Sequence, residues 1–489
     1  MSFDFLYSQD YVFTRFLLQR GLALLYFIGF LIAANQGRGL LGSNGILPIP
    51  IFLKRTTFNN HPSIFYFKYS DELYTSLAWI GVVVSALTFF GFSDSFGPLT
   101  SIAIWTVLWL LYMSFVNVGQ VFYGYGWEIL LLEAGFLAIF LGPTEQAVPL
   151  PVIWLYRWLL FRVMFGAGLI KIRGDECWRE LTCMYYHYET QPLPNPLSWF
   201  FHRLPKWFQK LSLLYNHLVE LVMPFFYFFP SYLGYISGLS TILFQSLIAL
   251  SGNLSWLNLI SIVLCISCFD DNFFKLFREL PPIVAEGPAL WQPPIMLFVT
   301  AILLFLSKKP LMNMISKRQV MNRSFDPWHL MNTYGAFGSI TRERMEVVLE
   351  GTMVENPDQH TKWVEYEFKG KPGNPQRCPP QVSPYHFKID WQMWFAAMSD
   401  YRYHPWILNF VGRILSGNKD VIDLLKEDPF DGQPPKYIQA KLYRYSFTKN
   451  LKEGWWERTY LGLYLPPLSL DDESFRIYLL EEGLFPEEE

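Results

Sequence analysis

The sequence predicts a polytopic α-helical membrane protein with a C-terminal soluble α+β domain that is rich in β-strands. Of the 489 residues, 52% are hydrophobic and only 17% are charged, whereas soluble globular chains are about 45–50% apolar and about 25% charged. The apolar residues also gather into long runs that stop near residue 310, after which the chain is mixed and charged. We therefore expect a membrane domain at residues 1–310 and a soluble domain at 319–489, a usual size for one domain.

Apolar segments follow one another through the predicted membrane domain. A bilayer core about 30 Å thick requires about 20 mostly apolar helical residues. Nine segments are of roughly this kind: 16–34, 73–92, 99–118, 127–141, 150–170, 211–229, 232–250, 254–269 and 290–306. Two of them, 127–141 and 211–229, carry acidic residues, so a tilted, buried or re-entrant helix is an alternative to a lipid-facing span. The N-terminus lacks a basic stretch followed by a cleavage site, so we expect the first segment to be retained as a span.

The C-terminal domain shows both strand and helix patterns. Residues 344–352, 363–373, 436–447 and 455–465 alternate apolar and polar side chains, which predicts strands. Residues 390–398 predict a helix capped by Asp390, because Trp391, Trp394, Phe395 and Met398 fall on one face. The tail at 487–489 is acidic, and we expect it to be solvated.

Charged residues within the apolar segments are the first candidates for function. Glu128 and Glu133 precede a segment that contains Arg157 and Arg162. A charge in a bilayer costs about 2.5 kcal/mol or more, so we expect these side chains to face the bundle interior and pair. A proton relay or a substrate counter-ion is the functional alternative.

The five cysteines are too few for a disulfide scaffold and too irregularly spaced for a structural zinc site. Cys265 and Cys268 form a C-x-x-C pair, which could exchange disulfides, but apolar and acidic neighbours favour two buried cysteines. Cys177 and Cys183 bracket a polar segment outside the membrane. A disulfide between them is a candidate in an oxidising compartment, with free thiols as the alternative.

A polar loop at 171–210 gathers histidine, glutamate, proline and aromatic residues. His187 with Glu189 could do acid-base work, and His202 adds a weak metal pattern, but the loop lacks any complete catalytic motif. Its prolines fix φ and favour extended neighbours, and a stiff segment loses little entropy on binding. We expect no catalytic, cofactor or metal site, and instead a client-docking loop made by Trp178, Tyr185, Tyr186, His187, Tyr188, Glu189, Pro192, Pro194, Pro196 and Trp199.

Two further patterns concern modification and partners. Asn322 opens the C-terminal domain in an N-x-S sequon and is a candidate for glycosylation if that domain faces a lumen. The sequon at Asn253 lies between apolar segments. The net charge of −3 does not suggest a nucleic-acid partner.

Several of these segments resemble the lipase maturation factor family. The stretch GLIKIRGDECWRELTCMYYHYETQPLPNPLSWFFHRLP (168–205) is similar to the family's signature segment, and it is long and unusual. Further similarity lies at 123–143, 330–341, 347–352, 363–373 and 390–398, so the resemblance covers most of the chain.

The resemblance implies a multi-pass, chaperone-like protein that helps secreted lipases fold and assemble into active form, without being an enzyme. It implies residence in the endoplasmic reticulum membrane in animals, or in the plasma membrane of a bacterium. A loop between spans is implicated in lipase binding. The alternatives are a membrane enzyme distantly similar to the vitamin K-dependent carboxylase, and a thiol-disulfide factor using Cys265 and Cys268. Self-association stays open.

Membrane sidedness gives two conflicting predictions. Nine spans place loops 35–72 and 171–210 and the C-terminal domain on one side, as the family resemblance implies. The basic residues of these loops would place that side in the cytoplasm: Lys54, Arg55, Lys171, Arg173, Arg203 and Lys206. We expect the lumenal side, with the cations of the longer loop paired to Glu176, Glu180 and Glu189.

Overall fold

Long apolar helices form a bundle that makes up the N-terminal part of the protein. The computed structural model describes residues 4–277, 279 and 285–485. Within them, six helical stretches are long and apolar enough to cross a bilayer. They are α1 (Val12–Leu41), α3 (Asp71–Phe89), α4 (Gly97–Val118), α6 (Leu150–Arg173), α12 (Tyr232–Ser251) and the stretch Gln292–Ile315, which comprises α15 (Gln292–Leu306) and α16 (Lys308–Ile315).

The other three predicted segments form shorter helices. A tilted, buried or re-entrant helix is the alternative that the sequence leaves open for 127–141 and 211–229, but not for 254–269. Segment 127–141 is α5 (Gly126–Ala138), which is buried at every position except Phe136. Segment 254–269 is α13 (Leu257–Cys265) followed by a 3-10 turn. Segment 211–229 is divided among α10 (Lys206–His217), a π-helical turn and α11 (Met223–Phe226), in which Pro224 cannot donate a backbone hydrogen bond.

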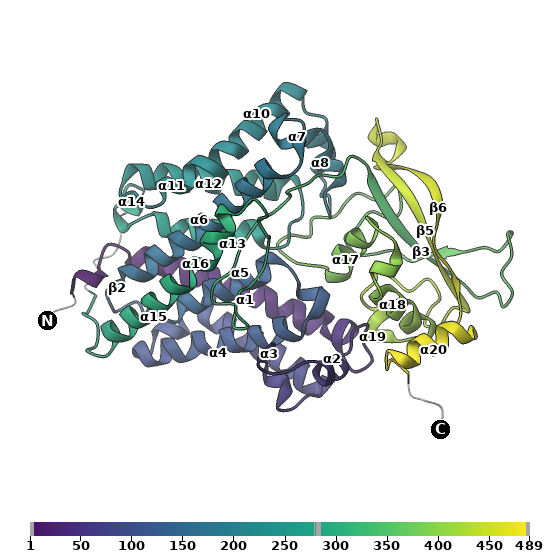
Figure 1. Cartoon of the computed structure of the whole chain (residues 1–489), viewed down its shortest axis with the longest axis horizontal. Coiled ribbons are helices and arrows are strands. Elements are labelled where there is room, and N and C mark those ends of the chain that lie inside the picture. Colours follow the sequence, from purple (N-terminus) through teal and green to yellow (C-terminus); the bar gives the residue numbers. More distant parts are fainter. Residues whose placement is uncertain (1–3, 278, 280–284, 486–489) are drawn as a thin grey trace.

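The two ends of the bundle are distinct. At one end, β1 (Tyr7–Ser8) pairs with β2 (Val148–Pro149), and Thr14 donates a hydrogen bond to the Phe269 carbonyl (2.7 Å). This end also carries α14 (Asp271–Lys275). The opposite end carries the C-terminal domain (Figure 1): Gln36 donates to the His386 carbonyl (2.7 Å), and Asn253 donates to that of Pro380 (2.8 Å).

The loops after α1 and α6 lie at the same end as the C-terminal domain. The first loop contains α2 (Ile49–Arg55), and its Ile46 carbonyl accepts a hydrogen bond from Asn409 (3.1 Å). The second contains α7 (Glu176–Arg179), α8 (Met184–Thr190) and α9 (Ser198–His202). Both loops therefore share one side of the bundle with the C-terminal domain.

The C-terminal domain is an antiparallel sheet packed on short helices. The strand order is β4 (Val364–Glu365), β3 (Arg344–Thr352), β5 (Tyr437–Phe447) and β6 (Trp456–Leu468), which leaves β6 at an edge. Helices α17 (Lys388–Ala396), α18 (Trp406–Leu415) and α19 (Lys419–Ile422) lie between the sheet and the bundle, and α20 (Glu473–Glu481) follows β6 (Figure 1).

Two predicted features of this domain differ in the structure. The predicted strand at 363–373 is reduced to β4, and the predicted cap Asp390 lies inside the first turn of α17 instead of before it. One interaction accounts for both: Asp390 Oδ1 accepts hydrogen bonds from the amides of Gly370 (2.5 Å) and Lys371 (2.9 Å). Those amides are therefore unavailable to a strand partner. The predicted acidic tail at 487–489 lies outside the described residues.

Apolar packing continues from the bundle into the C-terminal domain as one core. α1 and α19 approach so closely that a Cβ at Gly39 would lie 2.2 Å from the Asp420 carbonyl oxygen, so only glycine fits there. The predicted boundary near residue 310 falls within α16. Segments of the C-terminal part also reach back into the bundle, and these segments build the site.

Candidate functional site

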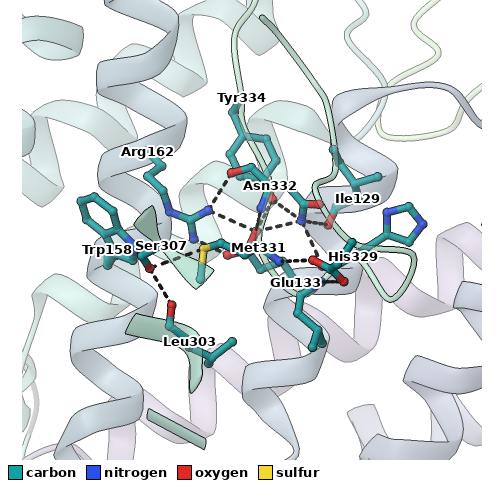
Figure 2. Close-up of polar contacts among 12 residues, drawn as sticks. Ile129, Glu133, Trp158, Arg162, Leu303, Ser307, His329, Met331, Asn332 and Tyr334 are labelled. Carbon is teal, nitrogen blue, oxygen red and sulfur yellow. Dashed lines mark hydrogen bonds and ion pairs between the residues drawn. The ribbon is translucent and has the colours of Figure 1, made fainter. Parts of the chain in front are cut away.

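A buried acidic side chain in the bundle holds a segment of the C-terminal part. Glu133 on α5 forms an ion pair with Arg162 on α6, and both are almost fully buried. Glu133 Oε2 also accepts hydrogen bonds from Asn332 Nδ2 (2.9 Å) and the Tyr334 hydroxyl (2.8 Å), while Arg162 donates to the Asn332 carbonyl (2.8 Å). Figure 2 shows these groups converging from three chain segments. The pair satisfies its own charges and fixes residues 332–334 against the bundle.

Glu128 has a different partner from the predicted one. Its Oε1 lies 2.6 Å from Lys388 Nζ on α17, and its Oε2 accepts a hydrogen bond from Tyr112 (2.5 Å). Arg157, the other predicted partner, donates instead to the Ser267 carbonyl (2.8 Å) and to Tyr11 (3.1 Å), and it forms no ion pair with any described residue.

The antiparallel packing of α5 and α6 explains this difference. Glu133 and Arg162 lie at the same level. Glu128 is five residues nearer the C-terminal domain and Arg157 five residues nearer the opposite end, about 7.5 Å along the axis in each case. Glu128 and Arg157 are therefore far from each other, and Lys388 supplies the charge that Glu128 needs.

A third buried ion pair ties the C-terminal end of α6 to the π-helical turn that follows α10. Lys171 Nζ lies 2.5 Å from Glu220 Oε1 and 3.0 Å from Asn216 Oδ1, and Asn216 donates to the second Glu220 oxygen (3.0 Å). Two other cations of this region donate to backbone carbonyls, Arg173 to Met314 (2.8 Å) and Arg179 to Ile172 (2.8 Å). Asp175 of the loop pairs with Arg342, which lies outside the loop (2.8 Å). Among the described residues, no ion pair joins Arg173 or Arg179 to Glu176, Glu180 or Glu189, contrary to the predicted pairing. The charge of Arg203 does act on Glu189, where it opposes the burial that raises the pKa of that carboxyl.

The predicted docking loop is packed between the bundle and the sheet. Cys177 and Cys183 form a disulfide, and Trp178 Nε1 donates to the Phe337 carbonyl (2.9 Å). Arg344 on β3 donates to the carbonyls of Glu189 (3.1 Å) and Pro192 (2.9 Å). These contacts hold the proline-rich stretch by its backbone.

None of the ten predicted docking residues is strongly exposed. Five are buried, namely Trp178, His187, Tyr188, Pro192 and Pro194, and five are half-buried, namely Tyr185, Tyr186, Glu189, Pro196 and Trp199. His187 and Glu189 do not act as a pair. Glu189 Oε2 accepts a hydrogen bond from the Phe447 amide (2.7 Å) and lies 3.9 Å from His202 Nε2.

A cavity of about 860 Å³ lies beside this loop. The predicted face of α17 lines it, with Trp391, Trp394, Phe395 and Met398 all on its wall. His187 also lines it, and burial lowers the pKa of this imidazole to about 4. This cavity was not predicted, because its walls come from helices that are distant in the chain.

The remaining candidates are three free cysteines and Asn322, of which Asn322 also lines the cavity. Cys265 and Cys268 are free and buried, and Cys378 is free and exposed. Asn322 is exposed, and its Oδ1 accepts a hydrogen bond from the Gly335 amide (3.3 Å). Within the described residues, no group of three or more His, Cys, Asp or Glu side chains could hold a metal ion. Lys388, Asn332 and Tyr334 were not predicted, since nothing in their local sequence marks them as partners of bundle residues.

Comparisons with known proteins cover both parts of the chain. Residues 13–276 match the lipase maturation factor transmembrane domain, and residues 330–466 match the lipase maturation factor C-terminal domain. The chain is 41% identical to mouse lipase maturation factor 1 over 96% of its own length and 89% of the relative. It is also 41% identical to human lipase maturation factor 1 over 98% of its length and 91% of the relative.

More distant similarity extends equally far. The chain is 31% identical to lipase maturation factor 2 of Xenopus laevis over 95% of its length and 83% of the relative. No solved structure matches the chain. The buried contacts described above lie largely within or between the two matched regions. Because both the helical bundle and the sheet domain match family domains, the chain belongs to the lipase maturation factor family.

Proposed function

We propose that this protein is a multi-pass maturation factor of the endoplasmic reticulum membrane that helps secreted lipases fold and assemble into active form, without catalysing a reaction itself. Family membership over both parts of the chain carries the proposal. The buried ion pairs support its non-catalytic part, because Glu133, Arg162, Glu128 and Lys388 satisfy one another as structural contacts.

The buried contacts between the bundle and the C-terminal part support a role in holding a client, because they make the C-terminal domain rigid relative to the membrane. Lys388 and Asn332 insert into the bundle from two different segments, and both are buried. A rigid surface loses little conformational entropy when it binds a partner. A client could therefore be held at a fixed distance and orientation above the bilayer.

The client-docking surface is best placed on the outer side of the predicted loop and on β6. We define it by Leu197 and Phe200 of the loop and by Tyr460, Leu461 and Leu463 of β6, which are all exposed apolar side chains. Trp199 joins the two parts, because its Nε1 donates to the Thr448 carbonyl between β5 and β6 (3.0 Å). An edge strand with apolar side chains can pair with an extended segment of a partner, which an incompletely folded client exposes.

The loop charges do not oppose a lumenal placement of this surface. The positive-inside rule acts through basic residues in short loops. Here Lys171 is buried at the end of α6 in its pair with Glu220. Fewer basic side chains therefore face water on this side than the sequence suggests.

The proposed function is tested in cells from which the gene has been deleted and to which a secreted lipase is supplied. We expect secreted lipase activity to fall far more than secreted lipase protein, and re-expression of this chain to restore the ratio. An unchanged activity per lipase molecule, for every lipase tested, would refute the proposal.

The docking surface is tested separately with Leu461→Lys combined with Leu463→Lys. Two charges on the edge of β6 disfavour pairing with an apolar segment, so we expect lower co-purification of the lipase and lower lipase activity. Ile477→Lys on α20 is the control, since Ile477 is equally exposed (47%) in the same domain. Equal loss in both variants would place docking elsewhere.

A further inference from the structure

The cavity beside the loop has a size suited to a small molecule. Its volume is about 860 Å³, within the range of about 300–1,000 Å³ that is typical of ligand sites. Its walls come from several helices of the bundle and the loop, α5 to α10, α12 and α13, and from α17 and residues 334–341 of the C-terminal part. Most lining side chains are apolar, including Met164, Phe244 and Trp391. The interior therefore favours a ligand with a large apolar part.

The charged groups in the wall leave no free charge for such a ligand. Lys171 and Glu220 both line the cavity and pair with each other at 2.5 Å. Asn216 bridges them through both of its side-chain atoms. An ionic ligand that bound one of these two residues would break the pair and leave the other as an unpaired buried charge, which is strongly destabilising. An ionic head group is thus disfavoured.

Two other buried polar side chains in the wall have unused hydrogen-bonding capacity. His187 is 8% exposed, and neither of its ring nitrogens hydrogen-bonds to any described residue. Asn258 is 4% exposed; its Nδ2 donates to Gln245 (2.7 Å), while its Oδ1 has no partner among them. Burial keeps His187 uncharged at neutral pH, because its pKa is about 4. Buried polar groups are usually satisfied, so both side chains lack a neutral hydrogen-bonding partner.

The cavity opens through a surface that a membrane would cover. Leu243 (54%) and Leu247 (41%) on α12, and Phe208 (40%) and Leu211 (54%) on α10, line it and are exposed. α12 is one of the helices able to span a bilayer. An apolar opening on the side of a membrane helix gives access from the bilayer. Phe395 and Met398 line the part of the cavity that adjoins the C-terminal domain.

We propose that this cavity is a lateral binding site for a neutral lipid that has an acyl chain and a hydroxyl-bearing head group. The chain lies among the apolar side chains between α10 and α12. The head lies near His187, where a hydroxyl can hydrogen-bond to the imidazole Nε2, which has no partner among the described residues. This site is separate from the client-docking surface and does not depend on the proposed maturation role.

Photolabelling of the full-length protein in nanodiscs tests the site. The probe is a monoacylglycerol with a diazirine in its acyl chain, and competitors are monooleoylglycerol, methyl oleate and oleate. We expect labelled peptides from α12 or from residues 334–341. Because one buried neutral hydrogen bond is worth about 0.5–1.5 kcal/mol, monooleoylglycerol should compete about 2- to 10-fold better than methyl oleate, and better than oleate.

Matched substitutions separate the cavity from the general lipid surface. Leu243→Trp and Leu247→Trp narrow the opening and should reduce labelling several-fold. Leu239→Trp and Leu250→Trp lie on the same helix, are similarly exposed (46% and 51%) and do not line the cavity, so they should label like the unmodified protein. His187→Phe should abolish the preference for monooleoylglycerol over methyl oleate.

Three results would overturn the proposal. Equal labelling of the Leu243→Trp and Leu250→Trp variants would mean that the probe only partitions onto the helix surface. Competition by oleate as strong as that by monooleoylglycerol would contradict a neutral head site. Labelled peptides confined to helices that do not line the cavity would place the lipid outside it.

Discussion

At the scale of single residues, the buried charges hold the two parts of the chain together. The Glu133–Arg162 pair is removed from water, so replacing one residue would leave the other as an unpaired buried charge, which strongly destabilises the fold. Breaking a buried pair typically costs about 3–5 kcal/mol. We expect Arg162→Met to lower the free energy of unfolding by about this amount, measured by denaturant unfolding in micelles. Arg55→Met, which breaks the exposed Arg55–Glu482 pair, should cost less than about 1 kcal/mol.

Substitutions of the two cysteine pairs distinguish a structural disulfide from a redox-active pair. Cys177 and Cys183 close a short loop, and removing such a disulfide typically costs about 2 kcal/mol or more. We expect Cys177→Ser with Cys183→Ser to lower stability accordingly. Cys265 and Cys268 are buried and free, so Cys265→Ala with Cys268→Ala should leave the lipase activity per secreted molecule unchanged. A loss of that ratio at normal expression would instead support thiol-disulfide chemistry.

Of the two buried ion pairs made by α5, the sequence allowed only the Glu133–Arg162 pair to be predicted, because it joins consecutive helices. Glu133 and Arg162 lie on α5 and α6, which are adjacent in the chain and pack in antiparallel fashion. The partner of Glu128 lies 260 residues away on α17. No periodicity or spacing connects residues so far apart, so only the folded structure reveals Lys388 as the counter-charge.

At the scale of elements, length and periodicity predicted the long helices and the long strands. β3 coincides with the predicted 344–352, and β5 nearly coincides with 436–447, although β3 is buried along almost its whole length and not on one face alone. The shorter bundle helices were harder to classify. Composition alone cannot distinguish a lipid-facing span from α5, whose surroundings are protein on almost every side.

The contact between α1 and α19 gives a test at this scale. Any side chain at Gly39 would collide with the Asp420 carbonyl, so Gly39→Ala should push α19 away from α1. We expect a destabilisation of about 1–3 kcal/mol, as for overpacked sites, and faster limited proteolysis of the C-terminal domain. Gly373→Ala is the control, since a Cβ there meets no atom within 4 Å. Equal proteolysis of both variants would mean that the two helices separate readily.

At the scale of the whole molecule, buried histidines make stability depend on pH. Burial lowers the pKa of His187, His202 and His329 to about 4 each, below about 6.5 in an unfolded chain. Between these values the unfolded state binds more protons, so stability falls as pH decreases from about 6.5 to 4. Each histidine should lower the free energy of unfolding by about 2 kcal/mol at pH 5 relative to pH 7.5. His187→Phe should reduce the difference between unfolding midpoints at these two pH values, and an unchanged difference would contradict a buried neutral imidazole.

Sidedness is the property of the whole molecule on which the maturation role depends, and the natural cysteines can report it. Cys378 is exposed in the C-terminal domain, whereas Cys265 and Cys268 are buried and Cys177 and Cys183 are joined. Ser95 is exposed in the turn between α3 and α4 at the opposite end of the bundle. In sealed microsomes, a membrane-impermeant maleimide should therefore label Ser95→Cys at once and Cys378 only after permeabilisation. A Cys378→Ser variant is the control for labelling at that site. Labelling of Cys378 in sealed vesicles would place the C-terminal domain in the cytoplasm, where it could not meet a lipase that folds in the lumen.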